Sequence, residues 1–279
     1  MTVREALADG RRMLAGGKIE DAAFEAEVLL RDTVQMSRAE LYLALEDGLS
    51  PQKYDAFRSR LGRRLGGEPT AYILGYREFY GRHFFVSDAV LVPRPETELL
   101  LEKALEVMRA QCLSVVADVG TGCGAVAVSL ALEQPEARVL ATDISPAALE
   151  IARANCRLHG VGDQVSLLEG DLLCPLPDPV EVIAANLPYV RQSDLAARGA
   201  LSFEPRIALD GGPDGLTTIR RLCLQAKRVL TSGTHLLLEV GDGQAREVAS
   251  FLEELFRPAV AEVATDLGGI DRVVALRIP

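Results

Sequence analysis

Four consecutive residues, Asn186-Leu187-Pro188-Tyr189, have the types and spacing needed to activate a planar nitrogen. The nitrogen of an amide or of an aromatic amine is a poor nucleophile until hydrogen-bond acceptors hold its hydrogens, because its lone pair is delocalised. The carboxamide oxygen of Asn186 and the backbone carbonyl of Leu187 are two such acceptors. Pro188 favours an extended backbone before it, which aims that carbonyl, and Tyr189 offers a ring face to a flat group. A plain turn at the end of a strand is the alternative interpretation.

A glycine-rich turn follows the first predicted strand of the larger domain. Its glycines allow a close backbone approach, and the helix behind it turns N–H groups toward a ligand. A tight turn without a ligand is the alternative, since the spacing G-x-G-x-G differs from the G-x-G-x-x-G of dinucleotide-binding proteins. The turn consists of Gly120, Thr121, Gly122, Cys123 and Gly124.

Two more candidates follow the next predicted strands. Asp143 ends the second strand about 20 residues after the glycines, where a carboxylate accepts hydrogen bonds from both hydroxyls of a ribose. Nicotinamide cofactors and S-adenosylmethionine both need that contact, whereas a helix cap before Ser145-Pro146 is the alternative role. Gly170-Asp171-Leu172 follows the third strand and suits the surroundings of an adenine ring, or forms a plain turn.

The elements that position these residues alternate between strands and helices. Apolar runs at 114–118, 138–143, 165–169, 180–186 and 235–240 predict strands. Helices are expected at 96–108, at 145–159 and at about 217–230, and a further helix is expected to follow the glycine-rich turn and to end at Glu133. This alternation predicts an α/β fold with a mostly parallel, doubly wound sheet. The runs 260–264 and 272–277 predict a terminal antiparallel hairpin at the edge or middle of that sheet.

The first 66 residues predict a small helical bundle. Capping boxes start at Thr2 and Ser37, and Ser50-Pro51 begins a fourth amphipathic stretch that ends at Gly66-Gly67. Aromatic and β-branched residues around Gly81-Arg82 predict a β-hairpin within 72–92. We therefore expect a helical domain at 1–68, a β-hairpin linker at 69–93 and a larger α/β domain at 94–279. The core positions expected in the bundle are Ala22, Ala26, Leu29, Leu30, Leu41, Leu45, Tyr54, Phe57, Leu61 and Leu65.

Composition excludes several classes of protein. With 48% hydrophobic and 25% charged residues the chain is neither disordered nor low in complexity, and its longest uncharged stretch, Val119 to Leu132, is too short and glycine-rich for a membrane helix. Met1 to Gly10 carries no secretory or transit pattern, so we expect a cytoplasmic protein. The net charge of −10 falls wholly beyond residue 66 and argues against nucleic acid partners.

The five cysteines form no C-x-x-C pair, and the three histidines lie far apart in the sequence. We therefore expect no metal site and no disulfide framework, and we expect the cysteines to be small buried residues. Nothing in the sequence predicts an oligomer, so a monomer is the expectation.

Over nearly its whole length the chain resembles the HemK/PrmC family, the peptide chain release factor glutamine methyltransferases. The resemblance rests on the motifs above, on the linker signature Pro93-Arg94-Pro95-Glu96-Thr97-Glu98, and on several later segments. These later segments are Glu204-Pro205 with Ala208-Leu209, Gly211 to Leu216, Glu239-Val240-Gly241 with Gln244, and Asp266-Leu267 to Asp271-Arg272.

The resemblance implies a class I, Rossmann-like methyltransferase domain that uses S-adenosyl-L-methionine and releases S-adenosyl-L-homocysteine. It implies methylation of the glutamine side-chain nitrogen in the Gly-Gly-Gln loop of class I release factors. Residues 120–124, Asp143, Leu172 and Asn186 would bind the cofactor. Asn186, Leu187, Pro188 and Tyr189 would bind the glutamine, with Asn186, Pro188 and Tyr189 catalytic, and the helical domain would dock the protein substrate or merely stabilise the fold.

Leu187 departs from this family, which usually has proline there. Asn-Leu-Pro-Tyr is the form found in adenine dimethyltransferases of ribosomal RNA, so an N6-adenine methyltransferase acting on RNA or DNA is the second hypothesis. It requires base flipping and a basic channel. A binding module that keeps the fold without the activity is the third, and the presence of Asn186, Pro188, Tyr189 and Asp143 argues against it.

Overall fold

The computed structural model describes residues 1–177, 179–197 and 203–279, and its chain divides into two compact units, Met1–Tyr76 and Arg77–Pro279. The boundary between them lies inside the predicted linker. Each unit has its own hydrophobic core. No helix among the described residues has the length and apolar character required to cross a membrane.

The first unit is the helical bundle that the sequence predicts. Both capping boxes form, with Thr2 paired to Glu5 and Ser37 to Glu40, and Ser50 caps the helix that Pro51 begins. Most of the expected core residues are buried or partly buried, but Leu65 is 38% exposed, so its assignment to the core was wrong. The helices are α1 (Val3–Gly16), α2 (Ala22–Val34), α3 (Arg38–Leu43), α4 (Pro51–Leu65) and α5 (Thr70–Leu74).

The predicted hairpin is present but shorter than expected. Strands β1 (Tyr76–Phe79) and β2 (Arg82–Phe85) pair with each other around a turn at Tyr80-Gly81. The prediction was wrong at its ends, because 70–74 is helical and 86–92 forms no strand. Val86, Val90 and Val92 are buried there instead, so their apolar character reflects packing rather than strand pairing.

The second unit is an α/β fold built on a seven-stranded sheet with the order β5-β4-β3-β6-β7-β9-β8. The first five strands in that order are parallel, and β9 runs antiparallel between β7 and β8, which confirms the terminal hairpin. The strands are β3 (Val115–Val119), β4 (Arg138–Asp143), β5 (Val165–Glu169), β6 (Val182–Ala185), β7 (His235–Glu239), β8 (Glu262–Thr265) and β9 (Asp271–Arg277).

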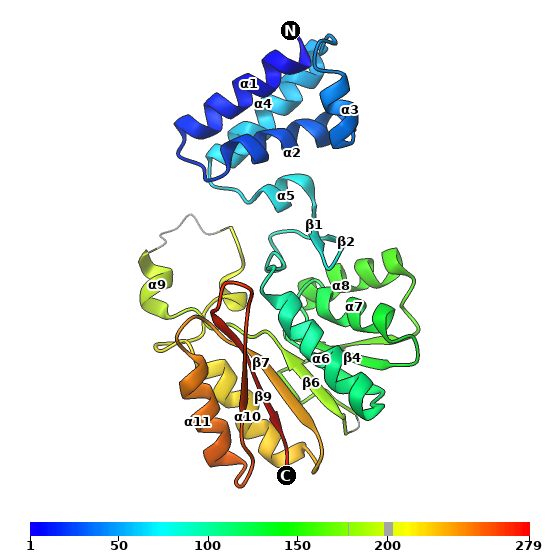
Figure 1. The fold of residues 1–279 in the computed structure, drawn as a ribbon, viewed down its shortest axis with the longest axis vertical. Coiled ribbons are helices and arrows are strands. Elements are labelled where there is room, and N and C mark those ends of the chain that lie inside the picture. The colour runs from blue at the N-terminus through cyan, green and yellow to red at the C-terminus, as the bar shows by residue number, and fades with distance from the viewer. Residues whose placement is uncertain (178, 198–202) are drawn as a thin grey trace. The chain divides into compact units, whose positions relative to one another are not determined.

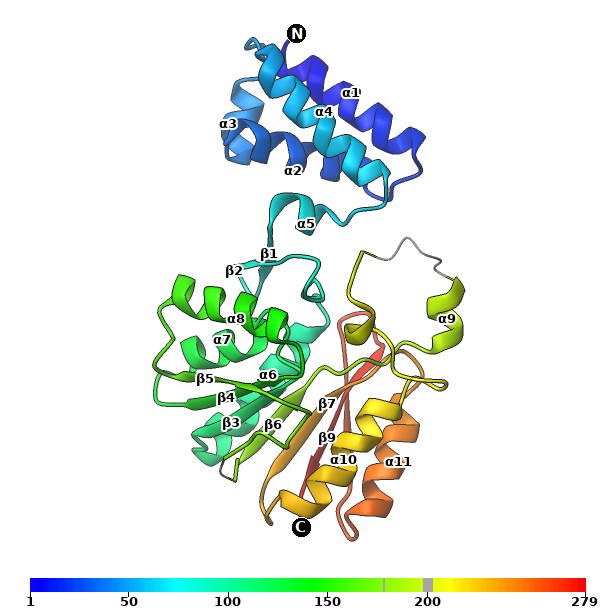
Figure 2. The ribbon, with the colours of Figure 1, turned by 180° about the vertical axis from the view of Figure 1, so that it is seen from behind.

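Helices cover both faces of this sheet, with α6, α7 and α8 on one side and α10 and α11 on the other (Figure 1, Figure 2). This explains why the inner strands read as continuous apolar runs: every residue of β6 is buried. The helix α11 was not predicted. The helices are α6 (Thr97–Gln111), α7 (Ala125–Glu133), α8 (Pro146–His159), α9 (Gln192–Ala197), α10 (Thr217–Val229) and α11 (Ala245–Leu255), with a short 3-10 turn at Arg206–Ala208.

Strand order reverses between β3 and β6, and chain direction places the carboxyl ends of both strands at the same edge of the sheet. Ligands of open α/β sheets bind in the crevice outside such a reversal. The glycine turn follows β3, and Asn186 follows β6. The topology therefore brings together two motifs that lie more than sixty residues apart in the sequence.

Candidate active site

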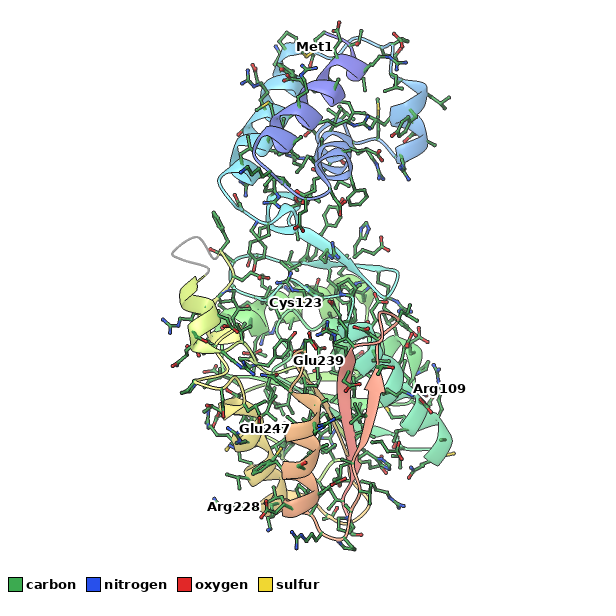
Figure 3. The ribbon with its side chains drawn as sticks, turned by 60° about the vertical axis from the view of Figure 1, so that its left-hand side comes forward. Met1, Arg109, Cys123, Arg228, Glu239 and Glu247 are labelled. Atoms are coloured by element: carbon green, nitrogen blue, oxygen red, sulfur yellow. The ribbon has the colours of Figure 1, made fainter. Side chains whose placement is uncertain are left out.

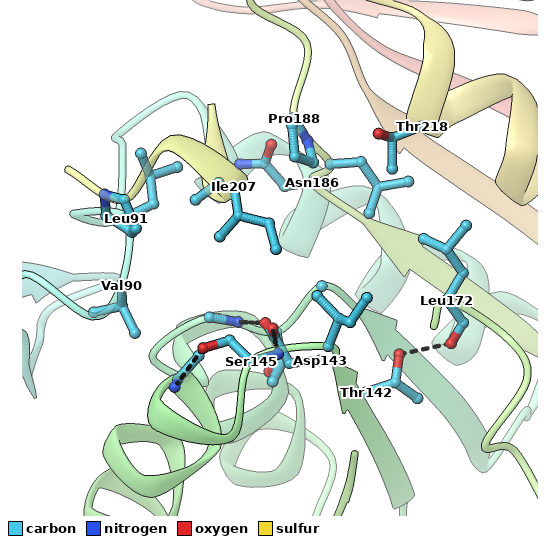
Figure 4. Close-up of a pocket in the computed structure, with 18 of the residues that line it drawn as sticks. Val90, Leu91, Thr142, Asp143, Ser145, Leu172, Asn186, Pro188, Ile207 and Thr218 are labelled. Atoms are coloured by element: carbon cyan, nitrogen blue, oxygen red, sulfur yellow. Dashed lines mark hydrogen bonds between the residues drawn. The ribbon is translucent and has the colours of Figure 1, made fainter. Parts of the chain in front are cut away.

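A cavity of about 650 Å³ opens at this edge of the sheet, within the second unit. This volume is in the range of small-molecule sites. Figure 4 shows Asp143 and Ser145 on one side of the cavity and Asn186 and Pro188 on the other. Nine of the predicted site residues line it, namely Gly120, Thr121, Gly122, Cys123, Asp143, Leu172, Asn186, Leu187 and Pro188. Gly124 and Tyr189 are not among its lining residues.

Buried hydrogen bonds hold the glycine turn in place. Asp118, the last residue but one of β3, accepts from the Thr121 hydroxyl at 2.6 Å and from the Ala127 backbone N–H at 3.1 Å. Burial raises the pKa of Asp118 to about 6, although these two donors oppose the shift. Asn155 donates from Nδ2 to the Cys123 carbonyl at 2.8 Å. The turn is therefore fixed from the strand below it and from α8 beside it.

Gly124 has a packing role. It begins α7 with a φ of +82°, a conformation that costs other residues about 1–2 kcal/mol. A Cβ built there would also lie 3.2 Å from the Cβ of Ala152. Gly124 thus allows α7 and α8 to approach closely behind the turn.

Asp143 supports the turn from the neighbouring strand. Its carboxylate accepts from the Gly122 N–H and from the Ser145 N–H, each at 2.9 Å. Ser145 caps α8, so Asp143 is not the helix cap that the sequence left open. Burial raises the pKa of Asp143. Each carboxylate oxygen keeps a second lone pair, which suits it to accept from a diol in the cavity.

Cys123 is buried at the base of the turn, and burial raises the pKa of its thiol to about 12. A thiol with that pKa stays protonated and is a poor nucleophile. Cys156 and Cys223 are also buried, but Cys112 and Cys174 are exposed, so the expectation that all five cysteines are buried was wrong. Within the described residues no cluster of potential metal ligands is found.

The loop after β6 places Asn186 at the cavity wall with its amide anchored. Asn186 Nδ2 donates to the Thr97 hydroxyl at 3.0 Å, and this contact leaves the carboxamide oxygen available to a ligand. Leu187 is 3% exposed and packs under the glycine turn, where a Cβ on Gly120 would lie 3.0 Å from Leu187 Cδ2. A leucine at this position therefore fills core space between the two motifs.

Tyr189 points away from the cavity into a buried polar cluster. Its hydroxyl donates to Glu239 Oε1 at 3.3 Å, and its backbone carbonyl accepts from Gln244 Nε2 at 3.0 Å. Gln244 also accepts from the Gly241 N–H at 2.8 Å, so one buried side chain ties the loop after β6 to the loop after β7. Burial raises the pKa of Tyr189 to about 12. In this conformation the ring stabilises the loop and does not stack on a group in the cavity.

The linker signature contributes one wall of the cavity. Arg94 and Thr97 line it, and Arg94 forms an ion pair with Glu204, whose other oxygen accepts from the Val92 N–H at 3.1 Å. Sequence reasoning named this segment without assigning it a role. It included Asp118 at the start of the glycine-rich motif without a role, and it missed Asn155, a single polar residue in a helix that carries no distinctive pattern.

Comparison with known proteins agrees with this geometry. Residues 5–75 match the family model of the PrmC N-terminal domain, and residues 95–203 match that of the methyltransferase small domain. The chain is 41% identical to a release factor glutamine methyltransferase of Moorella thermoacetica, covering 98% of this chain and 97% of that protein. It is 39% identical to the protein of the same name from Geobacter sulfurreducens, covering 99% and 97%.

A solved structure shares the fold. A methyltransferase from Pyrococcus furiosus superposes with a TM-score of 0.52 at 17% identity, covering 78% of this chain and 98% of that one.

Proposed function

The chain belongs to the family of release factor glutamine methyltransferases, and we propose that it methylates the side-chain amide nitrogen of the glutamine in the Gly-Gly-Gln loop of class I release factors. One observation carries the proposal: Asn186 stands on the cavity wall with its nitrogen bound to Thr97, and its oxygen has no hydrogen-bond partner among the described residues. That oxygen, together with the Leu187 carbonyl, supplies two acceptors for the hydrogens of a primary amide.

The cavity fits S-adenosyl-L-methionine as the methyl donor. Gly120 and Gly122 line it with positive φ angles of +77° and +56°, and Asp143 faces it with spare lone pairs. We propose that residues 120–123 hold the cofactor, with Asp143 at its ribose and Leu172 near its adenine, while Gly124 sets the approach of α7. When bound, the cofactor supplies a methyl group on a positively charged sulfur.

The protein then lowers the barrier by positioning and by hydrogen bonding. Asn186 and the Leu187 carbonyl hold the two amide hydrogens, which favours a pyramidal nitrogen with its lone pair directed at the methyl group. Pro188 restricts the backbone that presents the carbonyl. The amide nitrogen becomes acidic once it carries the methyl group, and it loses its proton to water. We propose that Tyr189 contributes by holding this loop.

We propose that residues 1–68 dock the protein substrate, with 69–93 as the linker to the methyltransferase domain 94–279. Support comes from the first unit having a complete core of its own. Removal of residues 1–66 is expected to raise KM for an intact release factor far more than for a short Gly-Gly-Gln peptide. Equal effects on both substrates would contradict docking. A substrate that acts in translation agrees with the cytoplasmic location expected from the sequence.

The proposal is tested with labelled S-adenosylmethionine and three acceptors: an unmodified release factor, the same factor with its glutamine changed to alanine, and ribosomal RNA. We expect label on the first acceptor alone. Label on RNA and not on the release factor would favour adenine methylation, and equal label on both forms of the factor would place the methyl group elsewhere.

A further inference from the structure

Thr142 is a fully buried polar residue near the end of β4, a strand that otherwise buries apolar side chains. Buried hydroxyls are nearly always hydrogen-bonded. This one donates to the backbone carbonyl of Leu172 at 2.9 Å, thirty residues further along the chain (Figure 4). Both residues line the cavity. The Thr142 side chain therefore ties the end of β4 to the loop after β5, at the wall of the proposed cofactor site.

The peptide group that follows Leu172 is held at both of its ends. Its carbonyl accepts from the Thr142 hydroxyl, and its N–H, which belongs to Leu173, donates to Gln225 Oε1 on α10 at 3.0 Å. Two hydrogen bonds from different elements fix the plane of this peptide. They thereby fix the ψ angle of Leu172.

Leu172 needs this support because its φ angle is +54°. A bulky residue rarely adopts the left-handed region, and such a conformation persists only where the surrounding structure enforces it. The Leu172 side chain is buried and forms part of the apolar wall of the cavity. Without the bond from Thr142, the φ angle of Leu172 is free to become negative, and that rotation redirects the side chain.

We propose that Thr142 is a positioning residue for the cofactor: its hydroxyl holds Leu172 in the left-handed conformation that presents the leucine side chain to the adenine ring. The inference rests on the proposed function, which sets the adenine near Leu172. The backbone carbonyl of Thr142 also accepts from the N–H groups of Gly120 and Thr121, each at 2.9 Å. The backbone of Thr142 thus orders the glycine turn, and its side chain orders the adenine wall.

Thr142→Val separates these two roles. It removes the hydroxyl, keeps the branched shape, and leaves the backbone bonds to the glycine turn. The apparent Kd of a ligand rises as the fraction of protein in the binding conformation falls. By calorimetry, Kd for S-adenosylhomocysteine should rise about tenfold, or about 1.4 kcal/mol, which is in the range for the loss of one buried hydrogen bond. Thr142→Ser keeps the hydroxyl and should stay within about threefold of the wild-type protein.

A second ligand tells adenine positioning from a general deformation of the cavity. S-ribosylhomocysteine has the sugar and the amino acid part but no adenine, so its Kd, measured by competition, should change less than about twofold in Thr142→Val. Equal losses for the two ligands would overturn the proposal. In a Leu172→Ala background, Thr142→Val should weaken S-adenosylhomocysteine no further, because the side chain to be positioned is absent. A full tenfold loss in that background would also overturn it.

Thr234→Val is the matched control. The Thr234 hydroxyl is buried and donates to the Val180 carbonyl at 3.0 Å, which is the same kind of bond. Thr234 follows α10, and Figure 3 shows Arg228, near the end of that helix, far from Cys123 of the glycine turn. Thr142→Val and Thr234→Val should lose similar stability in urea, but Thr234→Val should bind S-adenosylhomocysteine like the wild-type protein. Equal losses of affinity would mean that Thr142 contributes stability alone.

Amide hydrogen exchange tests the clamp without a ligand. The Leu173 N–H should exchange about tenfold faster in Thr142→Val than in the wild-type protein, because loop amides exchange through local opening. Thr142→Ser and Thr234→Val should leave its rate within about threefold. Gln225→Met removes the other bond of the same peptide, so it should also weaken S-adenosylhomocysteine, by about three- to tenfold. An unchanged exchange rate in Thr142→Val would contradict the clamp.

The kinetic consequence is confined to the cofactor. In methyl transfer to a Gly-Gly-Gln peptide, KM for S-adenosylmethionine should rise about tenfold in Thr142→Val while kcat at saturating cofactor stays within about twofold. A lower kcat with an unchanged KM would assign Thr142 to the chemical step instead and overturn the proposal.

Failure of this inference and failure of the proposed function are distinguishable. If the wild-type protein methylates the peptide but Thr142→Val and Thr142→Ser bind the cofactor alike, the positioning role is wrong and the proposed function stands. If the wild-type protein binds S-adenosylhomocysteine without methylating the peptide, the proposed substrate is wrong and the Kd values still decide the role of Thr142. If it binds no S-adenosylhomocysteine, both are wrong.

Discussion

Replacement of Asp143 by asparagine tests the cofactor site without changing side-chain volume. In the structure both carboxylate oxygens accept from backbone N–H groups, of Gly122 and of Ser145. An asparagine has one oxygen and one NH2 group, so its NH2 must face one of these two donors. The substitution therefore loses one of these two bonds and removes an acceptor from the proposed ribose position.

The magnitude follows from the charge on the acceptor. A hydrogen bond to a charged group contributes about 1.5–3 kcal/mol, so losing one ribose contact should weaken S-adenosylmethionine about 10- to 150-fold. Because burial already raises the pKa of Asp143, the cofactor should bind more weakly as the pH falls and the carboxyl becomes protonated. That pH dependence should be absent in Asp143→Asn.

Isothermal titration calorimetry of the apo protein with S-adenosylhomocysteine measures both effects. Asp163→Asn is the matched control, because Asp163 is exposed in the turn before β5. Its Kd should equal that of the wild-type protein. Equal Kd values for Asp143→Asn and the wild-type protein, with the variant folded, would refute the assignment of Asp143 to the cofactor.

Three further predictions concern the loops and the buried carboxyl. Asn186→Ala should lower kcat by about 100- to 1000-fold in methyl transfer while the cofactor Kd stays within about tenfold, and unchanged turnover would exclude Asn186 from the site. Gly215→Ala should lower the free energy of unfolding in urea by at least about 2 kcal/mol, because its Cβ would lie 2.4 Å from the Tyr189 carbonyl oxygen at a φ of +81°. Gly243→Ala is the control, because its φ is +77° but a Cβ built there would have no atom within 4 Å. Its free energy of unfolding should fall by only about 1 kcal/mol, and equal losses in the two variants would contradict the packing argument. Burial raises the pKa of Glu239 from its ordinary value of 4.5 to about 7 in the folded protein. As the pH rises through that interval, the free energy of unfolding of the wild-type protein should therefore fall by about 3 kcal/mol relative to that of Glu239→Gln. Parallel pH profiles of the two unfolding energies would refute this.

The fold could be predicted where local patterns and packing agree. The capped helices of the first unit gave clear periodicities and the buried parallel strands gave continuous apolar runs, and β4 was predicted at its observed bounds. The strand prediction for 86–92 was wrong because buried apolar residues in an irregular segment give the same sequence pattern as a strand. The core assignment of Leu65 was wrong because helical periodicity does not tell how completely a position is covered: Leu65 ends α4 beside Gly17 and stays 38% exposed.

The site could be predicted where a motif carries the chemistry. The glycine turn, Asp143 and Asn186 meet at one cavity, as expected from strands that end at the same edge of a sheet. Tyr189 does not line this cavity, because its hydroxyl donates to Glu239, fifty residues away in the sequence. Thr97 and Glu239 had no assigned role for the same reason: the hydrogen bonds of Thr97 with Asn186 and of Glu239 with Tyr189 join residues far apart in the sequence and leave no spacing signal.

The central claim is that the methyl group goes to the side-chain amide nitrogen of the Gly-Gly-Gln glutamine. Tandem mass spectrometry of a release factor treated with the protein and S-adenosylmethionine tests it most directly. We predict one added methyl group on that glutamine, released as methylamine on acid hydrolysis, and none after treatment with the Asn186→Ala variant under the same conditions. A methyl group on another residue, or an unmodified glutamine under conditions where the cofactor is consumed, would contradict the account.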